Sequence, residues 1–262
     1  MDVLELAIIG GGNMGTALLG GLLDSQVIDA SDVAVVEVVE SRRHELAERF
    51  PTVSIGDDVP ACRAAVLAVK PGDIPAAAAA AASGGATRVL SIAAGVRIAT
   101  IEQAVGPDVA VVRAMPNTPA LVRLGASAIA PGTTASSADV EWATTILHAV
   151  GTVELLDETA LDAFTGVAGS GPAYLFLVAE SLIDAAVAEG FDRPMAERIV
   201  QQLLLGSATL LHREGDPARL REMVTSPGGT TAAGLSVLDA RGVRDAFVAA
   251  VDAATDRSRQ LG

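Results

Sequence analysis

Residues 6–15 read Leu6-Ala7-Ile8-Ile9-Gly10-Gly11-Gly12-Asn13-Met14-Gly15, an apolar run followed by a glycine-rich turn. The run is typical of a buried strand, the turn has the spacing Gly-x-Gly-x-x-Gly, and residues 16–23 continue with a helical pattern. In this context Gly10 makes the tight turn, Gly12 leaves room for a pyrophosphate, and Gly15 lets the helix pack closely on the strand. The arrangement predicts dinucleotide binding. The alternative is a glycine-rich turn in another kind of α/β protein.

Apolar runs and helical patterns alternate as far as residue 157. Further strands are predicted at 33–36, 64–69, 89–92, 109–112, 126–130 and 153–156, with helices at 74–82, 98–105 and 138–149. This alternation predicts a parallel, doubly wound α/β sheet of the Rossmann type over residues 1–157. Ligands bind beyond the carboxyl ends of such strands. Lys70, Ala94 and Asn117 each follow a predicted strand, so we expect them to face the cofactor; for Lys70 the alternative is an ordinary surface lysine.

Glu37 ends the second predicted strand, about 20 residues beyond the glycines, where an acidic side chain usually binds ribose hydroxyls. It would repel the 2′-phosphate of NADPH and therefore favours NADH. Arg42 and Arg43 follow closely and could clamp that phosphate instead, or they could belong to a solvated helix start. The sequence leaves NADPH and NADH both open.

The strand pattern stops after residue 157. Helical patterns at 162–167, 172–189 and 194–212, then after Pro217, around Leu235 and at 246–254, predict an all-α domain over residues 158–262. The pattern at 194–212 is apolar nearly all round, which is typical of a buried helix. Since this half is too short to bury that helix by itself, we predict a homodimer formed through the C-terminal helices.

A loop of small residues, 224–235, leads into one of these helices. Ser226 and Thr231 offer hydroxyl groups, and Gly228 and Gly229 let a ligand approach the backbone closely. The helix start offers free N–H groups. The loop suits a small carboxylate, although a well-capped helix start would have a similar composition.

Composition excludes several classes of function. The net charge of −14 argues against a nucleic-acid-binding surface, which needs clustered Lys and Arg. A single cysteine, Cys62, cannot form a disulfide within the chain and fits a reducing cytoplasm. We expect no signal peptide and no membrane span, because the apolar pattern at 174–187 is short and carries two acidic residues. No metal cluster is predicted, and the scattered histidines His44, His148 and His212 are expected to be structural.

Six blocks carry a resemblance to a known family. They are Ile9-Gly10-Gly11-Gly12-Asn13-Met14-Gly15, Ala68-Val69-Lys70-Pro71, Ala93-Ala94-Gly95-Val96, Arg113-Ala114-Met115-Pro116-Asn117-Thr118-Pro119, Gly166-Val167-Ala168-Gly169-Ser170-Gly171-Pro172-Ala173-Tyr174 and Ser226-Pro227-Gly228-Gly229-Thr230-Thr231. With these blocks the chain resembles the pyrroline-5-carboxylate reductase family along nearly its whole length. The last three, in this order, are highly specific.

The resemblance implies reduction of 1-pyrroline-5-carboxylate to L-proline by NADPH or NADH, the last step of proline biosynthesis. It also implies a Rossmann domain followed by an all-helical dimerisation domain, and it allows larger rings such as a decamer of dimers. Thr231 would bond the ring nitrogen as the catalytic residue. The substrate carboxylate would be held by Ser226, Gly228, Gly229 and Thr230, with Glu214 and Thr165 lining the same pocket. Cofactor contacts would come from Gly10, Gly11, Gly12, Asn13, Met14, Gly15, Glu37, Ala68, Val69, Lys70, Pro71, Ala94 and Asn117.

Two positions depart from common family patterns. After the second strand, many members place Ser or Arg where a 2′-phosphate binds, and Glu37 stands near there instead. After the third strand, many members have Asn in a loop near the adenosine, which here reads Gly56-Asp57-Asp58. Both departures concern the choice of cofactor and leave the reaction untouched.

Two alternatives stay open. A β-hydroxyacid dehydrogenase would carry Gly-x-x-Gly-x-Gly-x-x-x-Lys; Gly166, Gly169 and Gly171 fit the glycines, but the lysine position is Leu175. A non-catalytic nucleotide-binding sensor would be suggested by loss of Ser226 or Thr231, and both are present.

Overall fold

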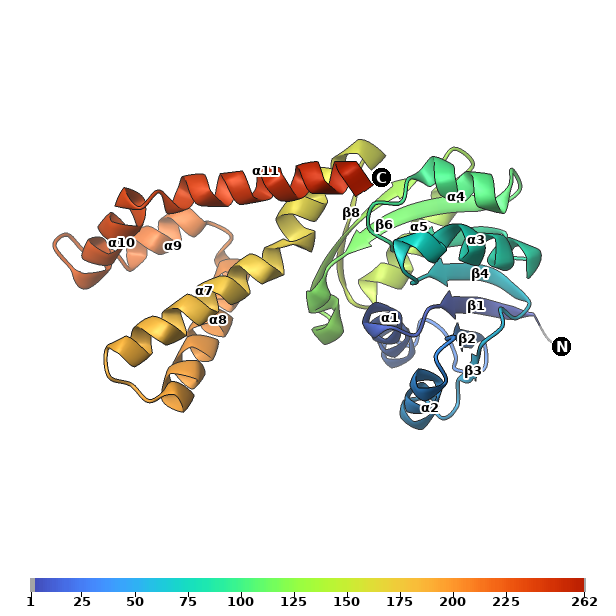
Figure 1. Cartoon of the computed structure of the whole chain (residues 1–262), viewed down its shortest axis with the longest axis horizontal. Helices are drawn as coiled ribbons and strands as arrows, with labels where there is room; N and C mark the ends of the chain where they lie inside the picture. Colours follow the sequence, from blue (N-terminus) through green and yellow to red (C-terminus); the bar gives the residue numbers. More distant parts are fainter. Residues whose placement is uncertain (1–2, 262) are drawn as a thin grey trace. The chain divides into compact units, whose positions relative to one another are not determined.

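The computed structural model describes residues 3–261 (Figure 1). Among these residues, eight strands form one sheet in the order β3-β2-β1-β4-β5-β6-β7-β8. The strands are β1 (Leu4–Ile9), β2 (Val33–Val36), β3 (Ser54–Gly56), β4 (Cys62–Leu67), β5 (Arg88–Ser91), β6 (Ala110–Pro116), β7 (Gly125–Pro131) and β8 (Gly151–Leu155). Helices α1 (Asn13–Asp24), α2 (Glu40–Arg49), α3 (Ile74–Ser83), α4 (Ile98–Val105) and α5 (Ser137–His148) and the short 3₁₀ helices η1 (Pro71–Asp73) and η2 (Thr118–Val122) connect them.

The predicted doubly wound, Rossmann-type fold is confirmed, with one departure from an all-parallel sheet. β6 and β7 pair antiparallel, with Arg113 opposite Ala130, and β8 then pairs parallel to β7. A parallel pair needs a long crossover connection, usually a helix. Only the short η2 segment joins β6 to β7, so the chain reverses direction there.

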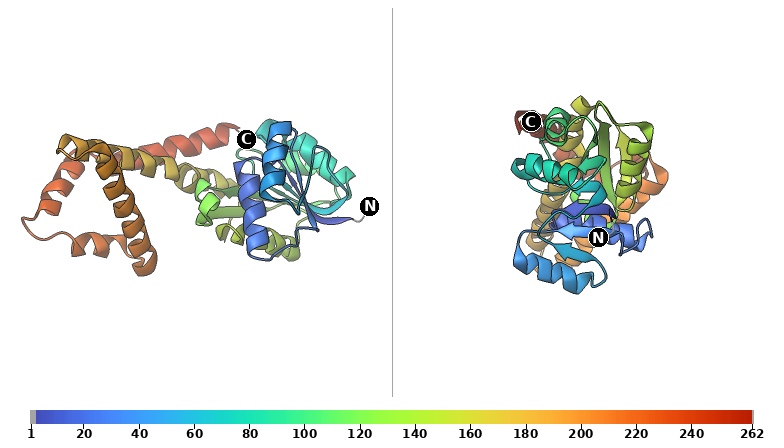
Figure 2. Two further views of the ribbon diagram at one scale, coloured as in Figure 1. Left: turned by 90° about the horizontal axis from the view of Figure 1, so that it is seen from below. Right: turned by 90° about the vertical axis from the view of Figure 1, so that its right-hand side faces the viewer.

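Helices cover both faces of the sheet (Figure 2). Successive side chains of a strand point to opposite faces. On β1, Ala7 and Ile9 therefore pack in the cluster that includes Ile101 of α4, whereas Ile8 packs in the cluster that includes Leu18 of α1. Fully burying one such large aliphatic side chain contributes about 1.5–3 kcal/mol. This two-sided burial fixes the sheet whose carboxyl edge carries the predicted cofactor residues.

The chain divides into two compact units. The first comprises the chain up to Ser170 together with the segment from Asp252 onward, and the second is Gly171–Val251. The sequence placed the boundary between residues 157 and 158. In space, the segment that follows packs with the sheet, because Leu161 is fully buried in the cluster on one sheet face. That segment contains η3 (Glu158–Ala160), α6 (Leu161–Phe164) and the π-helix η4 (Thr165–Gly169).

The second unit is helical, as predicted. It contains α7 (Gly171–Ala188), α8 (Arg193–Glu214), α9 (Pro217–Met223), α10 (Thr230–Ala240) and the first part of α11 (Val243–Leu261). α7 and α8 lie side by side (Figure 1). Asp192 begins α8 by accepting a hydrogen bond from the N–H of Met195 at 2.8 Å, which satisfies one of the free donors of a helix start.

α8 is exposed in the single chain: Leu203 and Leu205 are 50% and 61% exposed, and Ala196 and Val200 are its buried residues. This agrees with the prediction that the helical half is too short to bury this helix by itself. The expectation that the apolar stretch around α7 is too short for a membrane span is wrong, since the continuous helical segment Glu158–Ala188 is long and apolar enough, by length and composition alone, to cross a membrane. Sequence patterns report the apolar character of a helix but not what covers it.

Candidate cofactor and substrate sites

The glycine turn between β1 and α1 is closed on its inner side and open on its outer side. Gly10 has φ +111°, and a Cβ atom there would lie 2.4 Å from the carbonyl oxygen of Ala68. A Cβ on Gly15 would lie 2.0 Å from the carbonyl oxygen of Gly10, so the helix could not approach the strand. A Cβ on Gly12 would meet nothing within 4 Å. The open space lies at the N-terminus of α1, where Gly12 is the N-cap and no side chain caps the helix.

This opening fits a pyrophosphate. Helix N-termini offer unpaired N–H groups and a positive dipole end to anions. Gly10, Gly11, Gly12, Asn13, Met14 and Gly15 are all part of this turn and helix start, as predicted from the spacing. The structure thus contains the cradle that a dinucleotide needs.

Two further predicted segments lie at the carboxyl ends of neighbouring strands. Ala68, Val69, Lys70 and Pro71 follow β4, which pairs with β1, and the N–H of Ala68 donates to the carbonyl oxygen of Ile9 at 2.7 Å. Ala94 follows β5, the next strand in the sheet. Because parallel strands end at one edge, these segments share an edge with the glycine turn. Lys70 is the only lysine in the sequence, and its side chain is exposed.

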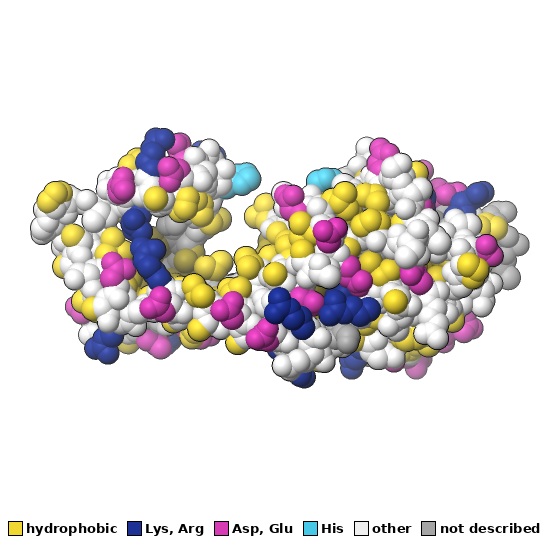
Figure 3. All heavy atoms as spheres, turned by 90° about the horizontal axis from the view of Figure 1, so that it is seen from above, with side chains coloured by type: hydrophobic (Ala, Val, Ile, Leu, Met, Phe, Trp, Pro, Cys, Tyr) yellow, Lys and Arg dark blue, Asp and Glu magenta, His cyan; other side chains and the backbone are white. Residues whose placement is uncertain are grey.

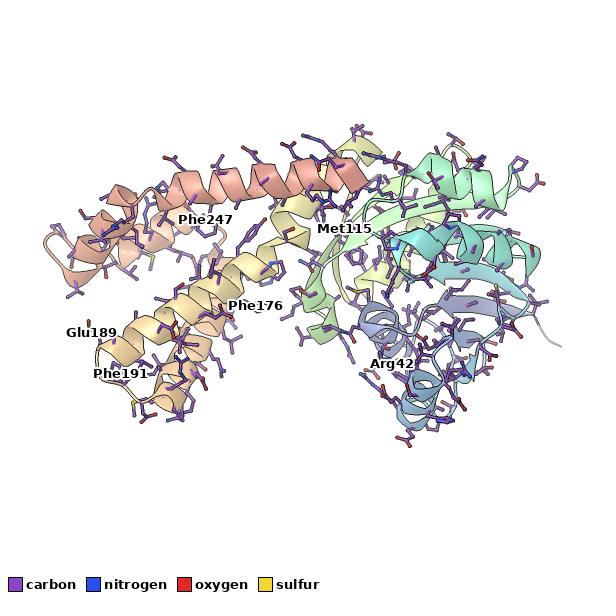
Figure 4. All side chains as sticks on the ribbon, in the orientation of Figure 1. Arg42, Met115, Phe176, Glu189, Phe191 and Phe247 are labelled. Carbon is purple, nitrogen blue, oxygen red and sulfur yellow. The ribbon has the colours of Figure 1, made fainter. Side chains whose placement is uncertain are left out.

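Glu37 lies beside the glycine turn at the end of β2. Its Oε2 atom accepts a hydrogen bond from the N–H of Gly11 at 3.1 Å, and its Oε1 atom accepts one from the N–H of Val39 at 2.9 Å. Arg42, which is labelled in Figure 4, donates to the carbonyl oxygen of Gly11 at 3.1 Å. Glu37 and Arg42, which the sequence predicts near the cofactor ribose, are therefore both hydrogen-bonded to the glycine turn that is predicted to bind the pyrophosphate.

The loop before α10 is a second open helix start. Gly228 has φ +72°, and Gly229 is the N-cap of α10 with no side-chain cap. The N–H of Gly229 donates to the carbonyl oxygen of Ser226 at 3.0 Å, and a Cβ on Gly229 would lie 2.5 Å from the Ser226 hydroxyl oxygen. Thr230 and Thr231 form the first turn of the helix. Glycine at 229 is thus required for the Ser226 hydroxyl to lie beside these N–H groups.

The predicted substrate residues are divided between the two units. Ser226, Gly228, Gly229, Thr230 and Thr231 form one loop of the second unit, and Glu214 ends α8 in the same unit, 3.6 Å from Arg219. Thr165 lies in the first unit, where its hydroxyl donates to the carbonyl oxygen of Leu161 at 2.7 Å. No group of three or more His, Cys, Asp or Glu residues that could hold a metal occurs within residues 3–261.

Two family models match the chain. "Pyrroline-5-carboxylate reductase dimerisation" matches residues 158–261, and "NADP oxidoreductase coenzyme F420-dependent" matches residues 5–95. The pyrroline-5-carboxylate reductase of Synechocystis sp. is 41% identical over 265 residues, which cover 99% of this chain and 98% of the relative. That of Methanosarcina acetivorans is 37% identical and covers 100% and 99%. The chain belongs to the pyrroline-5-carboxylate reductase family.

Solved structures of this family share the fold. The pyrroline-5-carboxylate reductase of Coxiella burnetii has a TM-score of 0.91 and 32% identity, covering 100% of this chain and 99% of that one. The pyrroline carboxylate reductase of Plasmodium falciparum, a crystal structure with NADP bound, has a TM-score of 0.85 and 28% identity over 100% and 99%. The resemblance drawn from the six sequence blocks is therefore confirmed. The match to a dimerisation domain also supports oligomerisation through the helical half.

Asn117, which the resemblance to pyrroline-5-carboxylate reductases assigns to the cofactor, also has a structural task. Its Nδ2 group donates to the carbonyl oxygen of Ala168 at 3.0 Å, and its Oδ1 atom accepts from the N–H of Ala126 at 2.9 Å. The side chain is largely buried, with the residue 9% exposed. Asn117 thus links the end of β6 to the π-helix that contains Thr165, and π-helical turns are frequent at functional sites.

Sequence reasoning missed a buried charge network next to this segment of the reductase. Arg113 on β6 is 2.8 Å from Glu158, and the same carboxylate oxygen accepts the N–H of Ile98 at 2.7 Å. Asp162, 2% exposed, pairs with Arg97 at 3.2 Å and accepts from the Ser258 hydroxyl at 2.7 Å. The available clue was Arg113, a charged residue that follows an entirely apolar strand pattern and must be paired when buried.

Proposed function

We infer that this chain reduces 1-pyrroline-5-carboxylate to L-proline with a hydride from NAD(P)H, as the last step of proline biosynthesis. The full-length similarity to proteins named pyrroline-5-carboxylate reductase carries this inference. The open glycine turn and the open start of α10 supply the two kinds of anion site that the reaction needs, one for a pyrophosphate and one for a carboxylate.

The substrate is a cyclic imine, so the chemistry depends on activating its C=N bond. When bound, NAD(P)H supplies the hydride. We propose that the Thr231 hydroxyl donates a hydrogen bond to the ring nitrogen, which makes the neighbouring carbon more electrophilic, or relays to the nitrogen a proton from water. We propose that the Ser226 hydroxyl and the N–H of Thr230, at the open start of α10, hold the carboxylate beside the backbone of Gly228 and Gly229, and that Glu214 and Thr165 also contact the substrate. The enzyme then acts mainly by proximity and orientation.

The role of Thr231 is tested by the variant Thr231→Ala. Losing one hydrogen bond to the reacting group should raise the barrier by about 2–4 kcal/mol, by comparison with oxyanion-hole donors. The turnover number should fall accordingly, while the dissociation constant of the cofactor stays unchanged. Ser236→Ala, an exposed hydroxyl on the same helix, is the matched control. A near-wild-type turnover number for Thr231→Ala would remove this role.

Neither alternative is favoured over the reductase. A β-hydroxyacid dehydrogenase needs a lysine where this chain has Leu175, which is 58% exposed on α7. A non-catalytic sensor would bind the cofactor but give no turnover. Initial rates of cofactor oxidation with 1-pyrroline-5-carboxylate, measured in parallel for NADPH and NADH, decide the matter: turnover with either supports the reductase, and binding without turnover supports the sensor.

We further propose that the protein is a cytoplasmic homodimer formed through the C-terminal helices, with a decamer of dimers as the larger assembly. Figure 3 shows apolar side chains exposed on the helical unit. The exposed large apolar residues of this unit include Phe176 and Leu177 on α7, each 63% exposed, and Leu205 on α8. A surface of this kind needs a partner in water. A buried, unpaired Cys62 fits a reducing compartment.

A further inference from the structure

We propose that this chain binds NADH in preference to NADPH, because the Glu37 carboxylate occupies the corner of the cofactor site that a 2′-phosphate would have to enter. The proposal rests on the proposed function, which names NAD(P)H without a preference. It concerns residues of this chain that differ from common family patterns.

The Glu37 carboxylate is fixed in place. Each of its two oxygens accepts a backbone N–H, one from Gly11 in the phosphate turn and one from Val39. The packing is tight as well: a Cβ on Gly11 would lie 3.2 Å from Oε2 of Glu37 and 2.4 Å from Cδ1 of Leu46. A carboxylate has about four lone-pair sites, so each oxygen can still accept one ribose hydroxyl. The side chain is therefore pre-organised for a ribose diol and cannot turn aside for a phosphate without losing two hydrogen bonds.

The two arginines that could have clamped a phosphate are committed elsewhere. Arg42 donates to Glu45 at 2.9 Å and to the carbonyl oxygen of Gly11 at 3.1 Å. Arg43 donates to the carbonyl oxygens of Glu37 and Val38 at 2.9 and 3.0 Å, and its guanidinium is 3.5 Å from Asp57. Each cation is thus paired with a carboxylate of its own. Arg43 also stabilises the backbone that carries Glu37.

The two residues directly after Glu37 offer no phosphate ligand from their side chains. Val38 and Val39 are 80% and 50% exposed. Valine has no donor group, whereas a 2′-phosphate is bound by Arg, Ser or Thr side chains or by N–H groups. The N–H of Val39 is already bonded to Glu37. These exposed apolar side chains suit the adenosine better than a dianion.

Dissociation constants for NADH and NADPH, measured by calorimetry in the absence of substrate, test the proposal. We expect NADH to bind about tenfold more tightly or better, because close like charges strongly disfavour the wrong ligand. Glu37→Gln should tighten NADPH binding by about tenfold. The matched control Glu48→Gln removes the same charge from an exposed position on α2 and should leave the ratio unchanged.

A second variant keeps the proposal testable if Glu37→Gln does not fold. Val38→Arg changes an exposed side chain and should tighten NADPH binding while leaving NADH binding nearly unchanged. Equal constants for the two cofactors in the wild type, or tighter NADPH binding, would overturn the proposal, as would a Glu37→Gln protein with unchanged NADPH affinity. Since no substrate is present, these constants stand apart from turnover: a protein with the expected ratio but no imine reduction would remove the proposed function and leave this inference intact.

Discussion

Gly12 and Gly15 belong to one turn, but a methyl group at each would have a different effect. Gly15→Ala should destabilise the fold by about 1–3 kcal/mol through overpacking, because its Cβ would lie 2.0 Å from the carbonyl oxygen of Gly10. Gly12→Ala meets nothing within 4 Å and should keep the wild-type melting temperature. Its methyl group would instead occupy the space of the pyrophosphate, weakening NADH binding about tenfold or more. Thermal unfolding and calorimetry separate the two effects; unchanged NADH affinity in Gly12→Ala would contradict the assignment.

Lys70 allows a direct test of the cofactor edge, because the sequence contains no other lysine. Its exposed side chain follows β4 at the predicted cofactor edge. We expect saturating NADH to slow acetylation of Lys70 by an N-hydroxysuccinimide ester, measured by mass spectrometry of the peptide that contains it. Gly12→Ala, which should bind cofactor poorly, serves as the control and should show no protection. Equal labelling rates with and without cofactor in the wild type would place Lys70 outside the site.

Cys62, unlike the exposed Lys70, is inaccessible to solvent. The residue is fully buried on β4, and burial raises the pKa of its thiol above the ordinary value. Since the thiolate is the reactive form, Cys62 should not react with a thiol reagent such as dithionitrobenzoate until the protein is unfolded in guanidinium. Above the ordinary thiol pKa the unfolded state loses its proton first, so this residue's contribution to stability should decline as pH rises. Rapid labelling of the native protein would contradict the burial.

At the scale of elements, the contact between β6 and the π-helix tests how Thr165 is positioned. Asn117→Ala would leave the carbonyl oxygen of Ala168 and the N–H of Ala126 without their partner, and each unsatisfied buried group costs about 1–3 kcal/mol. We expect a lower melting temperature and a raised KM for the imine. Asn117→Asp keeps the acceptor for Ala126 but sets a carboxylate oxygen against the carbonyl oxygen of Ala168, so it should lower the melting temperature at neutral pH at least as much as Asn117→Ala. A variant that binds NADH poorly with an unchanged melting temperature would instead support a purely cofactor-binding role.

The elements that the sequence predicted are those defined by local patterns. The β1–turn–α1 unit follows from apolar spacing and four glycines, and the strand Val33–Val36 and the helix Ile98–Val105 have the predicted bounds. β3 was missed because Ser54–Gly56 is three residues long and has no apolar run. The π-helix was missed because its hydrogen-bond pattern leaves no periodicity to recognise.

In the candidate site, too, the sequence predicted the segments with local patterns but not the contacts between distant residues. The glycine turn and the loop before α10 were predicted because each is continuous in sequence. The pairing of Glu37 with Gly11 joins residues 26 positions apart, and that of Arg42 with Gly11 joins residues 31 apart. Such contacts depend on how strands are ordered in the sheet, so the sequence could place an acid and two arginines near the ribose but could not show which of them faces it.

At the scale of the whole molecule, the helices of the second unit expose large apolar side chains that need a covering surface in water. The stretch Glu158–Ala188 has the length and composition of a membrane span, and none of its most apolar window is buried in the chain. The same exposure is expected of a dimerisation domain, which is what the family model for residues 158–261 describes. Obligate dimer interfaces resemble a domain core cut in half. We therefore propose that a second copy of the chain covers the exposed side chains of both α7 and α8.

Leu205→Glu tests this assignment, because it places a charge on the apolar surface of α8, where the side chain is 61% exposed. Burying an unpaired carboxylate in an interface is costly, so sedimentation should show a dimer for the wild type and a monomer for the variant. The wild type should also melt at a temperature that rises with protein concentration, as expected when association stabilises the fold. Gln260→Glu introduces the same charge at an exposed position outside the helical unit and should leave the dimer intact. Recovery of the wild-type protein only from detergent-solubilised membranes would show instead that lipid covers the apolar helices.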